Sequence, residues 1–398
     1  PGTEGPLAYS VQAIRPKSRT EGKLQQELTK QIDKSLATQV AARYDALPRS
    51  DRRRIAHQHR QTHTMACFTT SPTIKSQVPQ SIYTGCFALL LGAIDPAYRD
   101  LIGATIGDKT QSKVDTFGDA LGTTVLPGDR WRISHDAFKD RLHLDGCTLG
   151  LSIQQERYGL FTRFMSIAGQ DQFNQESIHE KKKKTIVPDL VTQNHPPGSM
   201  LFRPGIQMWE LKRVQAHDKF SIFTGASAGP NAHYAPTRNP TAPSGANHRA
   251  DQIPKEYEDK AKQTDNTYGS TGQTSVTDAL RDMATVRGLA IGAFGEFSDS
   301  IHDLIKGMAY EGSIKNAELF GTTDMAKAQS MISWWLTKRW NRLSVISAVQ
   351  MRYDALRYVG GTAQQQAAAN HTRLQAEEDE YVQEECRRFR DRDAMHHY

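Results

Sequence analysis

The chain has 398 residues, of which 50 are Lys or Arg and 44 are Asp or Glu, so that its formal net charge is +6. This length predicts roughly two to three domains, and the small positive charge permits nucleic-acid binding without requiring it. The 4 scattered cysteines indicate neither a zinc ribbon nor a disulfide framework and favour a reducing, intracellular compartment, and no apolar stretch reaches the roughly 20 residues of a membrane-spanning helix.

The first region, residues 1–115, is predicted to be helical. Between Lys23 and Leu47, apolar residues from Leu24 to Val40 recur at helical spacing, which indicates a helix with one apolar stripe. Residues 50–63 are rich in Arg and His and include Arg52-Arg53-Arg54. A run of this kind is typical of an exposed, solvated helix face, and phosphate contact is the alternative interpretation.

The central region, residues 116–310, is predicted to form an α/β core. Apolar runs at Ile186–Val191 and Ile206–Val214 indicate two buried strands. If these strands pair with each other, Asp189 on the first lies beside Glu210 on the second, at one end of the sheet.

Asp189, Glu210 and Lys212 together supply the parts of a metal-dependent phosphodiesterase. Glu210 and Lys212 share one face of their strand because side chains alternate between the faces. Two neighbouring carboxylates repel unless a divalent cation lies between them, and Mg²⁺ or Mn²⁺ suits one or two carboxylates plus a substrate phosphate. Asp189 and Glu210 are therefore the predicted metal ligands, and Lys212 is the group predicted to position the attacking water and stabilise charge on the phosphate.

Three further elements are predicted after the Glu-x-Lys strand. Arg249–Tyr268 has the apolar spacing of a helix, Val286–Phe294 is a short apolar run typical of a buried strand, and Ser298–Ala309 indicates another helix. The order is therefore strand, strand, helix, strand, helix. Within these segments we assign Tyr257 and Glu296 as support residues, with a structural role favoured for both.

The motif Pro188-Asp189 followed by Glu210-Leu211-Lys212 resembles the PD-(D/E)xK, or restriction-endonuclease-like, superfamily. This resemblance implies a mixed sheet flanked by helices, and nuclease activity. Over roughly residues 150–350, segments such as Val286–Leu289 and Phe294–Ser298 are similar to protist open reading frames that are often linked to reverse transcriptases in retroelements.

The resemblance also implies an acidic residue upstream of the Asp strand. Glu156, Glu176 and Glu180 compete for this role, and Glu156 lies in a segment, Gln154–Phe161, that is part of the resemblance. The His135-Asp136 dipeptide lacks the usual partners of a hydrolase metal centre, so we interpret His135 as structural.

A run of four lysines directly precedes the Asp strand: Lys181, Lys182, Lys183 and Lys184. Contact with the phosphates of a bound strand is one interpretation, and a solvated lead-in or a nuclear-targeting stretch is the other. Residues 224–247, rich in Gly and Pro, suit either a flap over substrate or an insertion. Residues 321–360 have helical apolar spacing, and the tail after 361 suits an exposed helix or an unstructured segment.

The sequence thus predicts an α/β protein with a helical region at 1–115, a nuclease-like core at 116–310 and a helical extension at 311–398. The predicted reaction is metal-dependent hydrolysis of DNA phosphodiester bonds, as part of a retroelement. RNA is the alternative substrate, and the strand and sequence specificity and a homodimer are left open. A module that binds nucleic acid, or assembles, without cutting is the main competing hypothesis, and a structural protein with a coincidental triplet is the third.

Overall fold

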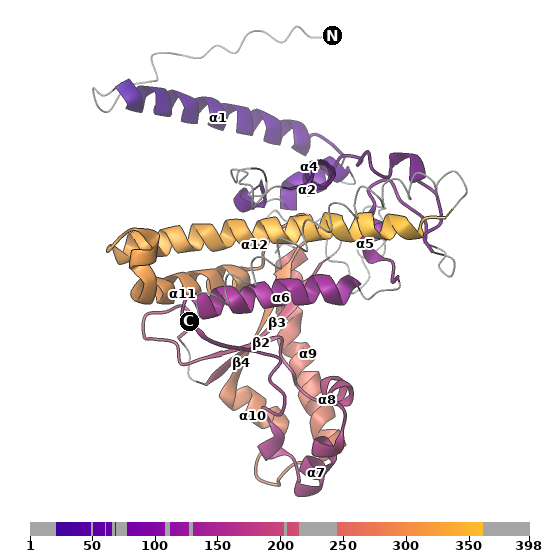
Figure 1. The fold of residues 1–398 in the computed structure, drawn as a ribbon, viewed down its shortest axis with the longest axis vertical. Coiled ribbons are helices and arrows are strands. Elements are labelled where there is room, and N and C mark those ends of the chain that lie inside the picture. Colours follow the sequence, from indigo (N-terminus) through magenta and orange to yellow (C-terminus); the bar gives the residue numbers. More distant parts are fainter. Residues whose placement is uncertain are drawn as a thin grey trace, which may run out of the picture.

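The computed structural model describes residues 21–48, 51–59, 61–65, 68, 78–107, 112–126, 130–202, 205–214 and 245–360. Most of the Gly- and Pro-rich stretch and the tail from residue 361 lie outside these ranges. The described residues form helices around an open, four-stranded mixed sheet, which confirms the predicted α/β class (Figure 1). No helix in these ranges is both long and apolar enough to cross a membrane.

The sheet has the strand order β1-β2-β3-β4. Its strands are β1 (Ser152–Gln155), β2 (Leu190–Gln193), β3 (Ile206–Arg213) and β4 (Ala284–Ile291). Strands β1, β2 and β3 pair antiparallel, whereas β4 runs parallel to β3. Both predicted strands around the Asp and the Glu-x-Lys motif therefore pair with each other as expected, although β2 begins only at Leu190, one residue after the Asp.

One face of the sheet packs on three long helices, α6 (Arg130–Thr148), α11 (Asp299–Asn316) and α12 (Met325–Ala355). Trp209 and Leu211 of β3 enter this core with Trp340 of α12, and all three side chains are fully buried. Full burial of each large apolar side chain contributes about 1.5–3 kcal/mol. Helix α12 therefore packs directly on the sheet. The predicted domain boundaries at residues 115 and 310 stay predictions.

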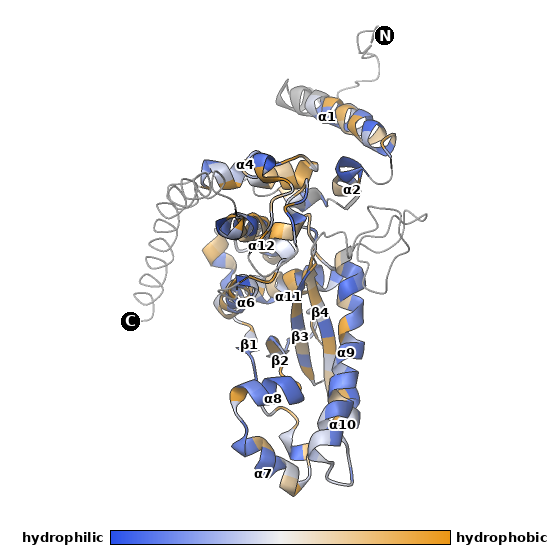
Figure 2. Ribbon diagram, turned by 90° about the vertical axis from the view of Figure 1, so that its right-hand side faces the viewer, coloured by the Kyte–Doolittle hydropathy of each residue, from blue (hydrophilic) through white to orange (hydrophobic). Residues whose placement is uncertain are grey.

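The other face of the sheet packs on α9 (Gly245–Tyr268), α10 (Val276–Met283) and α7 (Ile167–Gln175), with α8 (Ile178–Lys184) against α9. Figure 2 shows the amphipathic character of this layer, since the outer side of α9 is hydrophilic while β3 and β4 are largely hydrophobic. Gly288 of β4 allows the close approach of α9. A Cβ atom at this position would lie 2.5 Å from the carbonyl oxygen of Ala250.

Helices α2 (Arg52–His59), α4 (Gln80–Leu91) and α5 (Asp119–Thr123) share a core with the C-terminal half of α12, and α1 (Glu21–Asp45) packs against α2. The predicted helix at 23–47 is confirmed, but Ile32, Leu36 and Val40 of its apolar stripe are 40–45% exposed. The prediction for the Arg-rich run is wrong at Arg52. Its side chain is buried and forms an ion pair with Asp119, because α2 packs inward against α4 and α5.

Several predicted element bounds shift in the structure. The helix predicted at 298–309 is α11, which runs on to Asn316 and has Ser298 as its N-cap residue. The predicted apolar strand at 286–294 is β4, which begins earlier, at Ala284, and ends at Ile291 before a tight turn. The long helix predicted within 321–360 is α12, capped by the Asp324 side chain, which accepts hydrogen bonds from the backbone N–H groups of Ala326 and Lys327.

Candidate active site

Three acidic residues lie in one row across neighbouring strands. In the antiparallel register Leu190 of β2 is opposite Trp209 of β3, so the preceding Asp189 is opposite Glu210. On the other side Gln155 of β1 is opposite Leu190, and the backbone N–H of Glu156 donates to the Asp189 carbonyl at 3.2 Å. The acids therefore meet at one end of the three strands, on the row that the paired-strand hypothesis predicts.

Hydrogen bonds hold the Asp189 side chain in place at this end of the strands. Its Oδ2 accepts a hydrogen bond from the backbone N–H of Leu211 at 2.8 Å, and its side chain is 9% exposed. The Nε2 atom of His135, on α6, lies 3.2 Å from the same Oδ2 and 3.3 Å from the carbonyl oxygen of Leu211. No residue within the described ranges forms a hydrogen bond to Asp189 Oδ1, so one carboxylate oxygen is left for a ligand.

Glu210 links strand β3 to helix α9 through hydrogen bonds to both of its carboxylate oxygens. Its Oε1 accepts a hydrogen bond from Lys212 Nζ at 2.6 Å, and its Oε2 accepts one from the Tyr257 hydroxyl at 2.7 Å. Burial raises the pKa of Tyr257 well above its usual value, and the neighbouring Glu210 carboxylate raises it further, so the phenol stays protonated as a donor. The side chains of Glu210 and Lys212 remain 17% and 33% exposed, so solvent reaches this pair.

His135 belongs to the site, although the sequence interpretation made it structural. Its Nδ1 lies 3.2 Å from Asp136 Oδ1, and Asp136 also accepts a hydrogen bond from Lys139 at 3.0 Å. Burial lowers the pKa of His135, but hydrogen bonds and charge from Asp189 and Asp136 outweigh burial, and the net shift is upward. The His-Asp dipeptide was the only available signal, and only the packing of α6 beside β3 brings it to Asp189.

Glu156 is the upstream candidate that the fold brings nearest to Asp189. It adopts a left-handed backbone conformation with φ of 41°, and its Oε1 accepts hydrogen bonds from Lys139 at 2.5 Å and Lys182 at 2.9 Å. Burial alone would raise the pKa of Glu156, but these two lysines lower it to about 2. Glu156 therefore forms ion pairs with two lysines in this structure.

The two other upstream candidates have local roles. Glu180 completes a capping box with Ser177 at the start of α8. Glu176 forms an ion pair with Lys184 at 2.6 Å and accepts a hydrogen bond from the Tyr268 hydroxyl. Neither carboxylate lies in the row with Asp189 and Glu210.

The four predicted phosphate-contacting lysines occupy the last turn of α8 and differ in their contacts. Lys182 is paired with Glu156, Lys184 with Glu176, and the Lys181 ammonium lies 4.8 Å from the centre of the Phe173 ring. For Lys183, which is exposed, the described residues offer no hydrogen bond or ion pair. Glu156 and Glu176 therefore already offset part of the positive charge of this lysine run.

Lys260 of α9 is a cation that sequence reasoning missed. It lies one turn from Tyr257 and one turn from Thr264, whose hydroxyl donates to the Lys184 carbonyl at 3.1 Å, so its position on α9 is between Glu210 and the end of α8. Burial lowers the pKa of Lys260, Lys212 and Lys182 lower it further, and Glu210 and Asp189 oppose the shift. Within the described ranges it forms no ion pair.

Glu296, the second predicted support residue, lies in the turn after β4 instead of in this cluster. Its side chain is fully buried, and its Oε2 accepts a hydrogen bond from the backbone N–H of Phe294 at 3.0 Å. Glu296 therefore shapes the turn that connects β4 with α11.

The donor set at the site is small. Among the residues that the structure describes, no three His, Cys, Asp or Glu side chains gather into a group able to hold a metal ion. Mg²⁺, however, is usually held by only one or two carboxylates, several waters and substrate phosphate. Asp189, with its available Oδ1, and the partly exposed Glu210 fit this minimal requirement.

Comparisons of the chain with protein-family models, with curated proteins and with solved structures found no match. The functional interpretation therefore depends on the geometry of the site and on the chemistry of its residues.

Proposed function

We propose that the protein is a metal-dependent nuclease with the PD-(D/E)xK arrangement, which hydrolyses DNA phosphodiester bonds. The observation that carries the proposal is the placement of Asp189 opposite Glu210, with Lys212 on the same face and 2.6 Å from Glu210. The order of elements supports it. Helix α6 precedes the three antiparallel strands β1, β2 and β3, and helices α9 and α10 lead to the parallel strand β4.

Each side chain has a defined part in this proposal. Asp189 and Glu210 would hold the Mg²⁺ or Mn²⁺ ion, which when bound supplies positive charge and lowers the pKa of a bound water. Lys212 is close enough to Glu210 to orient a water between the carboxylates and the phosphate. Tyr257 holds Glu210 in position, and His135 holds Asp189.

The charge around the row favours a polyanionic substrate. Lys212, Lys260 and Lys182 surround the carboxylates, and Lys260 has no acidic partner among the described residues. Lys260, between the site and α8, is suited to contact the phosphate next to the one that is cleaved. Each phosphate contact of this kind makes binding dependent on salt concentration.

The test is cleavage of labelled single-stranded and duplex DNA, with an RNA strand as a further arm, in Mg²⁺ or Mn²⁺. Asp189→Ala and Lys212→Ala should each abolish cutting. Asp303→Ala on α11, which removes an ion pair with Arg287 of β4, and Lys262→Ala, on the exposed side of α9, are matched controls that should cut normally. Cutting that persists in both site variants, or cutting that needs no divalent ion, contradicts the proposal.

A non-catalytic nucleic-acid-binding module is the second candidate. It is favoured by one observation: both oxygens of Glu210 already accept hydrogen bonds, from Lys212 and Tyr257. Under this hypothesis the intact protein binds DNA equally well with and without the divalent ion and never cuts it. Isothermal titration with Mn²⁺ separates the candidates, since only the nuclease hypothesis expects heat of binding that disappears in Asp189→Ala.

A further inference from the structure

Helix α1 carries an apolar ridge that the described part of the chain leaves open. Ile32, Leu36 and Val40 recur every four residues and are 40–45% exposed. Tyr44, in the last turn, stacks on His57 of α2 with ring centres 4.9 Å apart, whereas the N-terminal half of α1 lies away from the other labelled elements (Figure 1, Figure 2). Helices in proteins are stabilised mainly by the packing of an apolar face, so this open ridge favours a partner that covers it.

The four-residue spacing determines how such a ridge can pack. In the sequence, Leu28 and Leu24 continue the same spacing toward the N-terminus. Side chains four residues apart form a continuous row on a helix, and two helices whose rows interlock cross at about −50°. Because the ridge is convex, a second copy of the same ridge can interlock with it around a two-fold axis.

The charges beside the ridge form a self-complementary pattern. The neighbouring row of side chains begins with Glu27 and ends with Arg43, both of them exposed, and the residues between them in this row are uncharged: Gln31, Ser35 and Gln39. In an antiparallel pair of helices, equivalent rows face each other in opposite directions, so Glu27 of each copy lies opposite Arg43 of the other. Parallel pairing would instead place this row against the opposite flank, whose single charge, Asp33, lies far from Arg43 along the helix.

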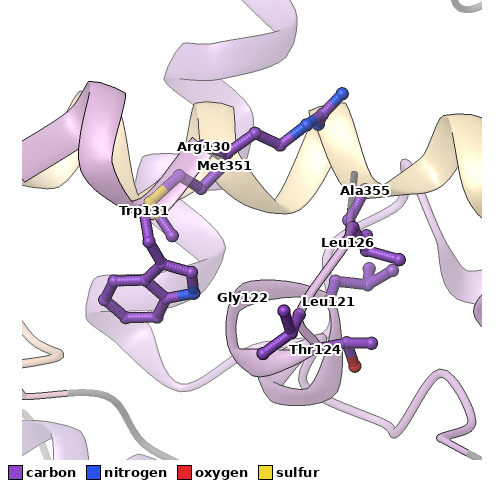
Figure 3. A pocket seen from close by; sticks show the side chains of 9 residues that line it. Leu121, Gly122, Thr124, Leu126, Arg130, Trp131, Met351 and Ala355 are labelled. Atoms are coloured by element: carbon purple, nitrogen blue, oxygen red, sulfur yellow. The ribbon is translucent and has the colours of Figure 1, made fainter. Parts of the chain in front are cut away.

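A pocket between α5, α6 and α12 is another apolar surface, but it lacks this pattern. Its volume is about 250 Å³, and its lining is mostly apolar, with Leu121, Gly122, Leu126, Trp131, Met351 and Ala355 among the lining residues (Figure 3). Arg130 is the only charged residue among the described ones that line it. Two copies of a concave pocket cannot fill each other, whereas two ridges can interlock, so α1 is the surface that fits a second copy of the chain.

We propose that this chain forms a two-fold symmetric dimer through α1, with two antiparallel ridges interlocked and Glu27 of each copy paired with Arg43 of the other. One helix of each copy makes the contact, so the interface is small and the dimer dissociates on dilution. The contact uses no residue of the candidate active site, and it is therefore independent of whether the chain cuts DNA.

Sedimentation of the full chain over a series of concentrations tests the proposal. The wild type should form a dimer at high concentration. Leu36→Glu should be a monomer throughout, because it places two negative charges between the ridges, while Lys34→Glu, on the opposite face of α1, should associate as the wild type does. Leu36 is 45% exposed, so its replacement should leave the chain folded, and circular dichroism of both variants checks this.

Charge reversal tests the antiparallel pairing. Glu27→Arg and Arg43→Glu should each weaken association by about tenfold, since two symmetry-related pairs change from attraction to repulsion, and the double variant should restore it. Added salt should reduce these differences. A wild-type monomer, a dimer that persists in Leu36→Glu, or a double variant that associates no better than the single ones overturns the proposal.

Discussion

Two buried carboxylates of this protein, Asp119 and Asp189, have opposite surroundings. Asp119 accepts hydrogen bonds from Arg52 at 2.7 and 2.9 Å and from Arg352 at 2.9 Å, and all three side chains are 4–6% exposed. Asp189 is 9% exposed, yet its charged partner is a single imidazole, and its Oδ1 is without a hydrogen bond within the described ranges.

The difference distinguishes a charge cluster that stabilises the fold, around Asp119, from a candidate catalytic cluster, around Asp189. The two arginines cover both oxygens of Asp119 and join α2, α5 and α12, so a ligand could bind there only by breaking the helix packing. Asp189 is instead fixed by one backbone N–H and one imidazole, which leaves part of the carboxylate for a cation or a water. Burial alone therefore does not identify a functional acid, whereas incomplete pairing at a solvent-accessible edge does.

Glu210→Gln should have the largest effect on the cleavage rate. The amide keeps the shape and can still accept a hydrogen bond from Tyr257, but it removes the charge beside Lys212, so we expect the cleavage rate to fall by about 10²–10⁴-fold with little change in melting temperature. Single-turnover cleavage in Mg²⁺, with circular dichroism on the same samples, measures both. A wild-type rate in this variant would place the chemistry elsewhere.

Asp119→Ala should have the largest effect on stability. It leaves Arg52 and Arg352 buried without a counter-charge, which costs about 3–5 kcal/mol. Urea denaturation measures this loss, and Asp259→Ala is the control, because Asp259 and its partner Lys262 are 64% and 59% exposed and such surface pairs contribute about 0–1 kcal/mol. Equal losses in the two variants would mean that the Asp119 cluster is not a closed structural unit.

Glu156 should make stability depend on pH in the acidic range. Its folded-state pKa is lowered from 4.5 to about 2, so its contribution is fully present above pH 4.5 and is lost as the pH falls toward 2. We expect a loss of up to about 3 kcal/mol, reduced by solvent screening. Denaturation of Glu156→Gln at several pH values should lack this slope, and an unchanged slope would exclude the pairing with Lys139 and Lys182.

Asp136→Asn should have the smallest of these effects. Asp136 touches neither Asp189 nor Glu210, but it orients the His135 ring that contacts Asp189. Partners of this type change metal affinity or activity by about 10–100-fold. Titration with Mn²⁺ should show weaker binding, while Asp140→Asn, on the same helix and bonded to Gln155, should bind Mn²⁺ as the wild type does.

The sequence by itself determined the strands β2, β3 and β4, though not β1, and the shared face of Glu210 and Lys212, because the alternation of side chains is a local property of the backbone. It also predicted the pairing that brings Asp189 to Glu210, since both apolar runs require burial in one sheet. Only the tertiary structure decided that His135 reaches Asp189, that Glu156 pairs with two lysines, and that Arg52 is buried. These contacts join residues 17 to 67 positions apart. They depend on how helices pack on the sheet, which no local spacing encodes.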